Sequence, residues 1–128
     1  MPNPNDIKFA LTYYIVRVFG GPNGLMGNRV VVETHGKAAH NAAGHNPPIV
    51  DKDVKEIMVG CLFFHDTGAT IPQNTLSYTE GAQMHYPISA LSAVLKLLKE
   101  AERLWIAFSP DVQTAYLFTW DEPVGTGR

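Results

Sequence analysis

Alternation of apolar and polar residues predicts that most of this chain forms β-strands. Residues 8–19 are rich in β-branched and aromatic residues and contain no Gly or Pro, with Phe9, Leu11, Tyr13 and Ile15 on one face. Beyond Ile15 the apolar positions shift by one residue, which indicates a bulge or burial on both sides. Similar patterns predict further strands at 29–35, 54–65, 104–108 and 114–120. A turn at 66–72 is followed by a weaker strand or a hairpin at 76–86, with its bend at Glu80-Gly81.

One amphipathic helix is predicted from about residue 89 to residue 102. Its apolar residues recur at spacings of three and four, and they are Ile88, Leu91, Val94, Leu95, Leu98 and Ala101. Pro87 precedes the helix, and Ser89 is a suitable cap. Short links between successive strands favour antiparallel neighbours. We therefore predict an α+β fold, with an antiparallel sheet of five to six strands and this helix packed on one face.

A length of 128 residues fits a single domain spanning 1–128. Residues 1–6, which are rich in Pro and Asn, and residues 121–128 are predicted to be frayed tails. The segment 36–48 has neither strand nor helix periodicity and ends in Pro-Pro, so we predict a surface loop there.

Charge and cysteine content bear on the partners and the compartment. The ten basic residues are scattered and the formal net charge is −2, so we do not expect nucleic-acid binding. Only 17% of residues are charged, and so sparse a charged surface suggests that another copy of the chain or a different partner covers part of it. Cys61 is the single cysteine and lies in an apolar run, which predicts a buried thiol. No leader-like segment or membrane span is visible, so we expect a cytoplasmic protein.

Asp66-Thr67-Gly68 follows a predicted strand and resembles the motif of aspartic proteases, of which the retroviral type is a homodimer with one Asp from each subunit. In that family two adjacent carboxylates share a proton and one activates water. The sequence departs from the family at His65, where an apolar residue is usual. Asp-Thr-Gly is also good turn chemistry. A small hydrolase using Asp66 with His65 is therefore an alternative function.

Three histidines recur every five residues, at His35, His40 and His45. Five positions on a helix rotate a side chain by about 140°, so this spacing cannot bind a metal from one helix face. In a loop the rings can converge, and neutral imidazole suits zinc, copper or nickel. No cysteine or carboxylate lies between them to complete a site. Metal binding here is a second alternative, and we expect no cofactor.

Aromatic residues at the two ends of the chain suggest a binding surface. Tyr13 and Tyr14 fall on opposite faces of the first strand, and Trp105 lies in the strand before the last. Tyr116, Phe118 and Trp120 share one face of the last strand. One helix covers one face of a sheet, so the other face must meet water, a ligand or another subunit. The favoured interpretation is a non-enzymatic, homodimeric module that binds a small molecule or a protein through this aromatic-lined sheet face.

Overall fold

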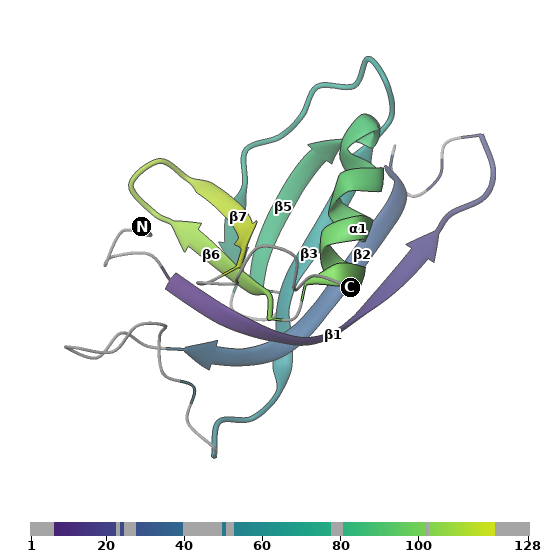
Figure 1. The fold of residues 1–128 in the computed structure, drawn as a ribbon. Coiled ribbons are helices and arrows are strands. Elements are labelled where there is room, and N and C mark those ends of the chain that lie inside the picture. The colour runs from purple at the N-terminus through teal and green to yellow at the C-terminus, as the bar shows by residue number, and fades with distance from the viewer. Residues whose placement is uncertain are drawn as a thin grey trace.

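Seven strands and one helix make up most of the part that the computed structural model describes, which is residues 7–22, 24, 28–39, 50, 53–77, 81–101 and 103–119 (Figure 1). The strands are β1 (Ile7–Val18), β2 (Asn28–Ala39), β3 (Ile57–His65), β4 (Thr75–Ser77), β5 (Gly81–Pro87), β6 (Trp105–Ser109) and β7 (Thr114–Phe118). A 3₁₀ turn, η1 (Ile88–Ala90), leads into α1 (Leu91–Glu100).

All seven strands join one sheet in the order β4-β5-β3-β2-β1-β6-β7. The prediction of five to six antiparallel strands is therefore wrong in number, and also in direction at one place. β3 and β5 run parallel, with Gly60 opposite Ala82. The connection between them includes β4, whose three residues pair antiparallel with β5. The local sequence of this segment is typical of a turn followed by a hairpin, which favours antiparallel neighbours and gives no sign of a crossover.

Strand β2 continues to Ala39, so the predicted loop 36–48 begins as a strand. Residues 36–39 pair with β1, and their ladder bonds outweigh the weak strand signal of Gly36-Lys37-Ala38-Ala39. The rest of that loop and both predicted tails, 1–6 and 121–128, lie outside the described residues.

The helix is shorter than predicted. Ser89 lies inside the 3₁₀ turn, and no side chain caps either η1 or α1. The chain becomes extended at Ala101, where φ is −67° and ψ is 137°. No helix in the described ranges is long and apolar enough to cross a membrane.

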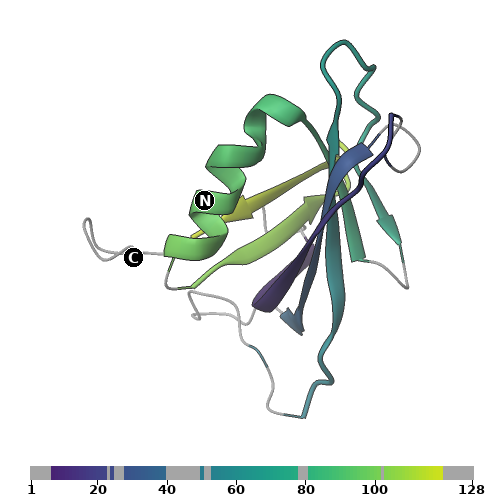
Figure 2. The same cartoon turned by 90° about the vertical axis from the view of Figure 1, so that its right-hand side faces the viewer.

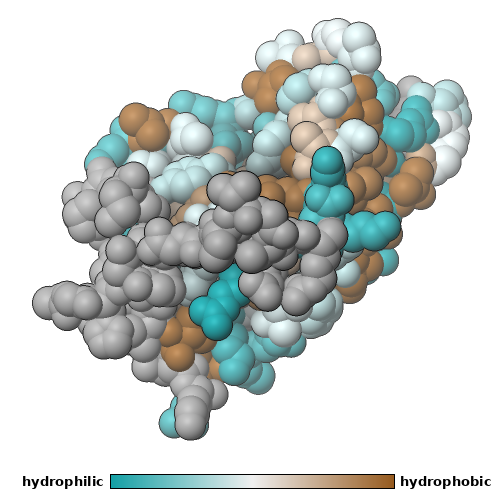
Figure 3. Space-filling view, viewed as in Figure 1, coloured by the Kyte–Doolittle hydropathy of each residue, from teal (hydrophilic) through white to brown (hydrophobic). Residues whose placement is uncertain are grey.

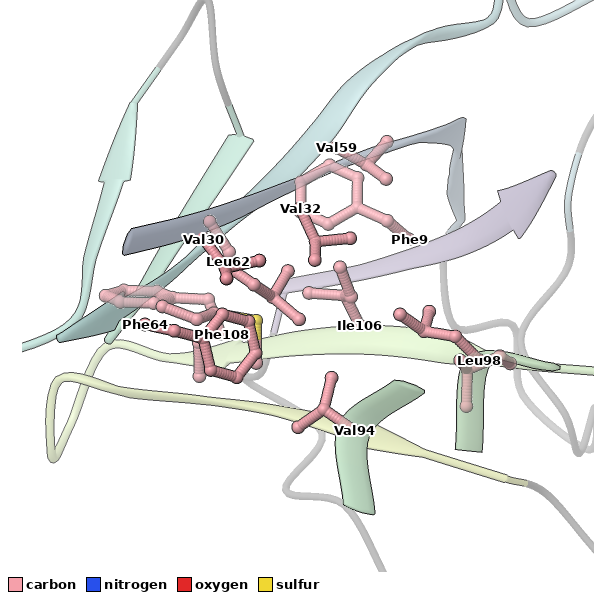
Figure 4. Close-up of a cluster of buried hydrophobic side chains, with 14 residues drawn as sticks. Phe9, Val30, Val32, Val59, Leu62, Phe64, Val94, Leu98, Ile106 and Phe108 are labelled. Carbon is pink, nitrogen blue, oxygen red and sulfur yellow. The ribbon is translucent and has the colours of Figure 1, made fainter. Parts of the chain in front are cut away.

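The sheet curls so that β6 and β7 lie on the same side of the long strands as α1 (Figure 2). β5 contacts β6 and β7 although they are not neighbours in the sheet. One buried cluster fills the enclosed space, where Val94 and Leu98 of α1 lie among side chains from every strand except β4 (Figure 4). The helix therefore shares the covering of this face with the sheet's own β6–β7 hairpin.

Candidate functional site

The C-terminal half of β1 has β2 on one side and no strand on the other within the described residues (Figure 1). β6 pairs with β1 only as far as Ala10, and a last bond runs from the Leu11 N–H to the Leu104 carbonyl at 3.0 Å. The register with β2 then shifts between Leu11 and Tyr13, so that Thr12 is a bulge. The sequence predicted a bulge or burial on both sides beyond Ile15, whereas the bulge lies at Thr12 and Val16 and Val18 are exposed.

The hydrogen-bond pattern shows which backbone groups of this edge point away from β2. The Phe19 N–H donates to the Arg29 carbonyl at 2.9 Å, so these two residues form a hydrogen-bonded pair of the β1–β2 ladder. Such pairs alternate along an antiparallel ladder, and the residues between them direct N–H and C=O away from the partner strand. The residues of β1 whose backbone groups face the free side are Tyr14, Val16 and Val18.

Apolar side chains line this same edge. Tyr13, Ile15 and Val16 are 45%, 37% and 40% exposed, and Val18 is the most exposed large apolar residue described, at 71%. Brown, hydrophobic atoms gather on the right of the space-filling view, where the C-terminal half of β1 runs (Figure 3). Arg17 is the one charged residue in this half of the strand, and its Nε donates to the Glu33 carboxylate. We call residues 13–18 the free β1 edge.

A pocket of about 280 Å³ adjoins the free β1 edge. It opens between the bulge of β1 and the last turn of α1, and it is lined by Leu11, Thr12, Tyr13, Tyr14, Leu98, Ala101 and Leu104. Tyr14 also packs against the buried core, whereas Tyr13 faces the opposite side of the sheet and stacks on the His35 ring at 4.7 Å. The two tyrosines thus lie on opposite faces, and both border this pocket.

The other predicted aromatic residues form a contact cluster that is partly buried. Trp105 stacks with Phe118 at 6.3 Å between ring centroids, and Phe118 lies 5.5 Å from Tyr116. Trp105 is only 5% exposed, and its indole N–H has no hydrogen-bond partner in the part of the chain described. Trp120 lies outside the described residues. The cluster therefore presents less aromatic surface than the sequence suggested.

The predicted catalytic pair is divided between a strand end and a turn. Asp66 is half-buried, its carboxylate lies 3.9 Å from Arg29 Nη2, and its carbonyl accepts the Ala69 N–H. Gly68 has a φ of 87°, which a turn of this kind requires. The tripeptide therefore serves as a turn after β3, and its carboxylate faces an arginine rather than the His65 ring.

His65 instead meets a residue that the sequence did not indicate as its partner. The Nε2 atom of His65 and the Nδ1 atom of His85 are 2.9 Å apart and share a hydrogen bond. Burial, and then the neighbouring His65, lowers the pKa of His85. Because β5 runs parallel beside β3, a histidine twenty positions away enters the same site. A prediction that β3 and β5 pair in parallel would have indicated the contact between His65 and His85.

The predicted histidine loop is described only at His35, which lies in β2 rather than in a loop. Its Nε2 atom is buried, lies 3.9 Å from Glu33 Oε1 and has no hydrogen-bond partner in the structure described. His40 and His45 lie outside the described residues. Among those residues, no three His, Cys, Asp or Glu side chains gather in a way that could hold a metal. Cys61 is buried, as predicted.

Comparison of the chain with protein-family models, with curated proteins and with solved structures finds no match to any of them.

Proposed function

We propose that this protein is a self-associating binding domain, in which the free β1 edges of two copies pair antiparallel to form one continuous sheet. The observation that carries the proposal is a half-strand with exposed apolar side chains, whose outward backbone groups meet no other strand among the residues that the structure describes. Unpaired edges of this kind are templates for adding another strand. Proteins commonly protect such edges with lysine or proline, and this edge has neither. The proposal keeps the homodimer expected from the sequence and moves its contact from the sheet face to the sheet edge.

Two-fold symmetry restricts the register of this pairing. Two residues that lie opposite each other across the dimer must place their side chains on the same face of the continuous sheet. This is possible only if their two residue numbers add up to an even number. Centring the axis on Val16 places Val16 opposite itself and Tyr14 opposite Val18 of the second copy. These are the residues with outward backbone groups, so all three pairs can form hydrogen bonds. Arg17 then lies opposite Ile15, and no like charges face each other.

The pocket gives this arrangement a second, self-complementary contact. Val18 lies on the same face of the strand as Tyr14, because the two are four residues apart in the regular part of β1. In the dimer, Val18 of one copy is therefore placed beside Tyr14 and the pocket of the other. A two-fold axis makes this contact twice. Val18 of each copy thus covers the pocket of the other copy, and the pocket in turn buries the exposed side chain of Val18.

Replacement of Val18 by lysine tests the proposal. Burying an exposed valine contributes roughly 1–2 kcal/mol, and the contact occurs twice, so the dimer should be weakened by about 2–4 kcal/mol. That corresponds to at least about a thirtyfold rise in the dimer dissociation constant, measured by analytical ultracentrifugation. The matched control is Val112→Lys, because Val112 is 64% exposed and lies in the β6–β7 turn. The control should leave the dimer intact.

Both substitutions are on exposed positions and should leave the free energy of unfolding nearly unchanged. A wild-type protein that stays monomeric at high micromolar concentration would refute the proposal. A dimer that resists Val18→Lys but dissociates on Tyr116→Ala would place the contact on the aromatic cluster instead.

A further inference from the structure

The paired histidines form a site that self-association does not use. His65 ends β3, and His85 lies in β5, where the parallel register sets it opposite Phe63. The Phe63 ring stacks on the His85 ring at 5.1 Å with planes 17° apart, which restrains the orientation of that imidazole. The backbone N–H of His85 donates to Asn74 Oδ1 at 2.9 Å. Both rings are therefore mounted on paired strands rather than on loops.

The two facing nitrogens are close to the separation that a shared metal ion requires. Nitrogens bound to one tetrahedral zinc ion at about 2.0–2.1 Å lie roughly 3.3 Å apart. His65 Nε2 and His85 Nδ1 are 2.9 Å apart, and small ring rotations supply the remaining few tenths of an ångström. Neutral imidazole nitrogen is a preferred ligand of zinc, copper, nickel and cobalt ions.

A buried acceptor lies on the next strand. Asn28 is the residue opposite His65 in the β2–β3 ladder, and its Oδ1 atom is buried with no hydrogen-bond partner in the structure described. A metal-bound histidine normally donates its other ring N–H to such an oxygen, which fixes its tautomer. With Nε2 on a metal, the N–H of His65 is on Nδ1. Asn28, which lies opposite His65 in the ladder, then offers an oxygen that can accept it.

We propose that His65 Nε2 and His85 Nδ1 together bind one divalent transition-metal ion of the zinc, cobalt, nickel and copper group. The present hydrogen bond requires one hydrogen on one of these two atoms. When the metal binds, that hydrogen moves to the other nitrogen of the same ring, so two neutral imidazoles bind the ion without net release of a proton. Water completes the coordination, because no third protein ligand converges in the part described.

Titration of the full-length protein with Co²⁺ or Zn²⁺ alone, followed by calorimetry, tests this site. We expect one ion per chain, with saturable binding lost in His65→Ala and in His85→Gln. Asn28→Ala should weaken binding by about tenfold, as removal of an outer hydrogen-bond partner commonly does. The matched control is His35→Ala, which removes a histidine from the same sheet outside the pair and should bind normally. Binding should also raise the melting temperature of the wild type but not of His85→Gln.

A readout on the wild type avoids dependence on variants that fold poorly. The Cu²⁺ electron paramagnetic resonance spectrum should show splitting from two imidazole nitrogens. Absence of binding at millimolar Co²⁺ and Zn²⁺ would overturn the proposal, as would binding that survives in His85→Gln. Binding that disappears in a His40→Ala, His45→Ala double variant but persists in His65→Ala would assign the metal to the segment predicted from the sequence.

Discussion

Gly36 determines how closely β1 and β2 approach at the bulge, and its replacement by alanine is a severe test of the fold. Gly36 lies opposite Leu11, one residue before the register shift at Thr12. A Cβ added there would lie 2.8 Å from the carbonyl carbon of Ala10 and 3.0 Å from the Cα of Leu11, with the Ala10 oxygen closer still. All these neighbours are backbone atoms, so no side chain can rotate to make space, and the two strands must separate.

The expected cost follows from two effects. Inserting a methyl group into a filled space costs about 1–3 kcal/mol. Separation of the strands also weakens about two ladder hydrogen bonds, each contributing roughly 1 kcal/mol. Gly36→Ala should therefore lower the free energy of unfolding by about 3–5 kcal/mol. A chain of 128 residues has a total stability of about 6–19 kcal/mol, so this is a large fraction of it.

Urea denaturation followed by circular dichroism measures this change directly, and the melting temperature should fall by about 10 °C or more. Gly20→Ala is the matched control, because a Cβ at Gly20 meets nothing within 4 Å and Gly20 has no positive φ. The control should be neutral or slightly stabilising. A Gly36→Ala protein within 0.5 kcal/mol of the wild type would show that the close approach of β1 and β2, and with it the geometry of the free edge, is incorrect.

Two further predictions concern the core. Burial raises the pKa of Tyr86 to about 12, so the folded protein keeps the phenol proton between pH 10 and 12 while the unfolded chain loses it. Stability should therefore be complete below pH 10 and fall by about 2–3 kcal/mol toward pH 12, and Tyr86→Phe, compared by urea melts at pH 9 and 11.5, should lose this decline. Leu62 is fully buried, and Leu62→Ala should cost about 3 kcal/mol in the same assay. Leu76→Ala, at a 39% exposed leucine, should cost under about 1 kcal/mol, and equal costs would contradict the assigned core.

Part of the candidate site could be foreseen from local pattern. Tyr13 and Tyr14 were expected on opposite faces because neighbouring side chains of a strand alternate. A bulge in that strand was also indicated by the change in apolar parity. The sequence did not indicate that the bulge lies at Thr12. Tyr13 and Ile15 are apolar, so they continue the pattern expected of core residues although their side chains lie on the outer face. The burial of Trp105 depends on how the β6–β7 hairpin sits in the curled sheet, and a sequence pattern carries no such information.

Local sequence pattern was enough to predict the helix and the central part of most strands, because side-chain periodicity is set by backbone geometry and needs no knowledge of neighbours. It missed the end of β2 at residues 36–39, which is a strand because it pairs with β1. Which strands lie side by side depends on the tertiary structure. The parallel placement of β5 beside β3 brings His85 to His65. Because β6 stops pairing at Ala10, the rest of β1 has no second strand beside it in the part of the chain that is described. Both outcomes come from contacts between residues far apart in the chain. Their energies depend on the whole sheet, so no local stretch of residues contains them.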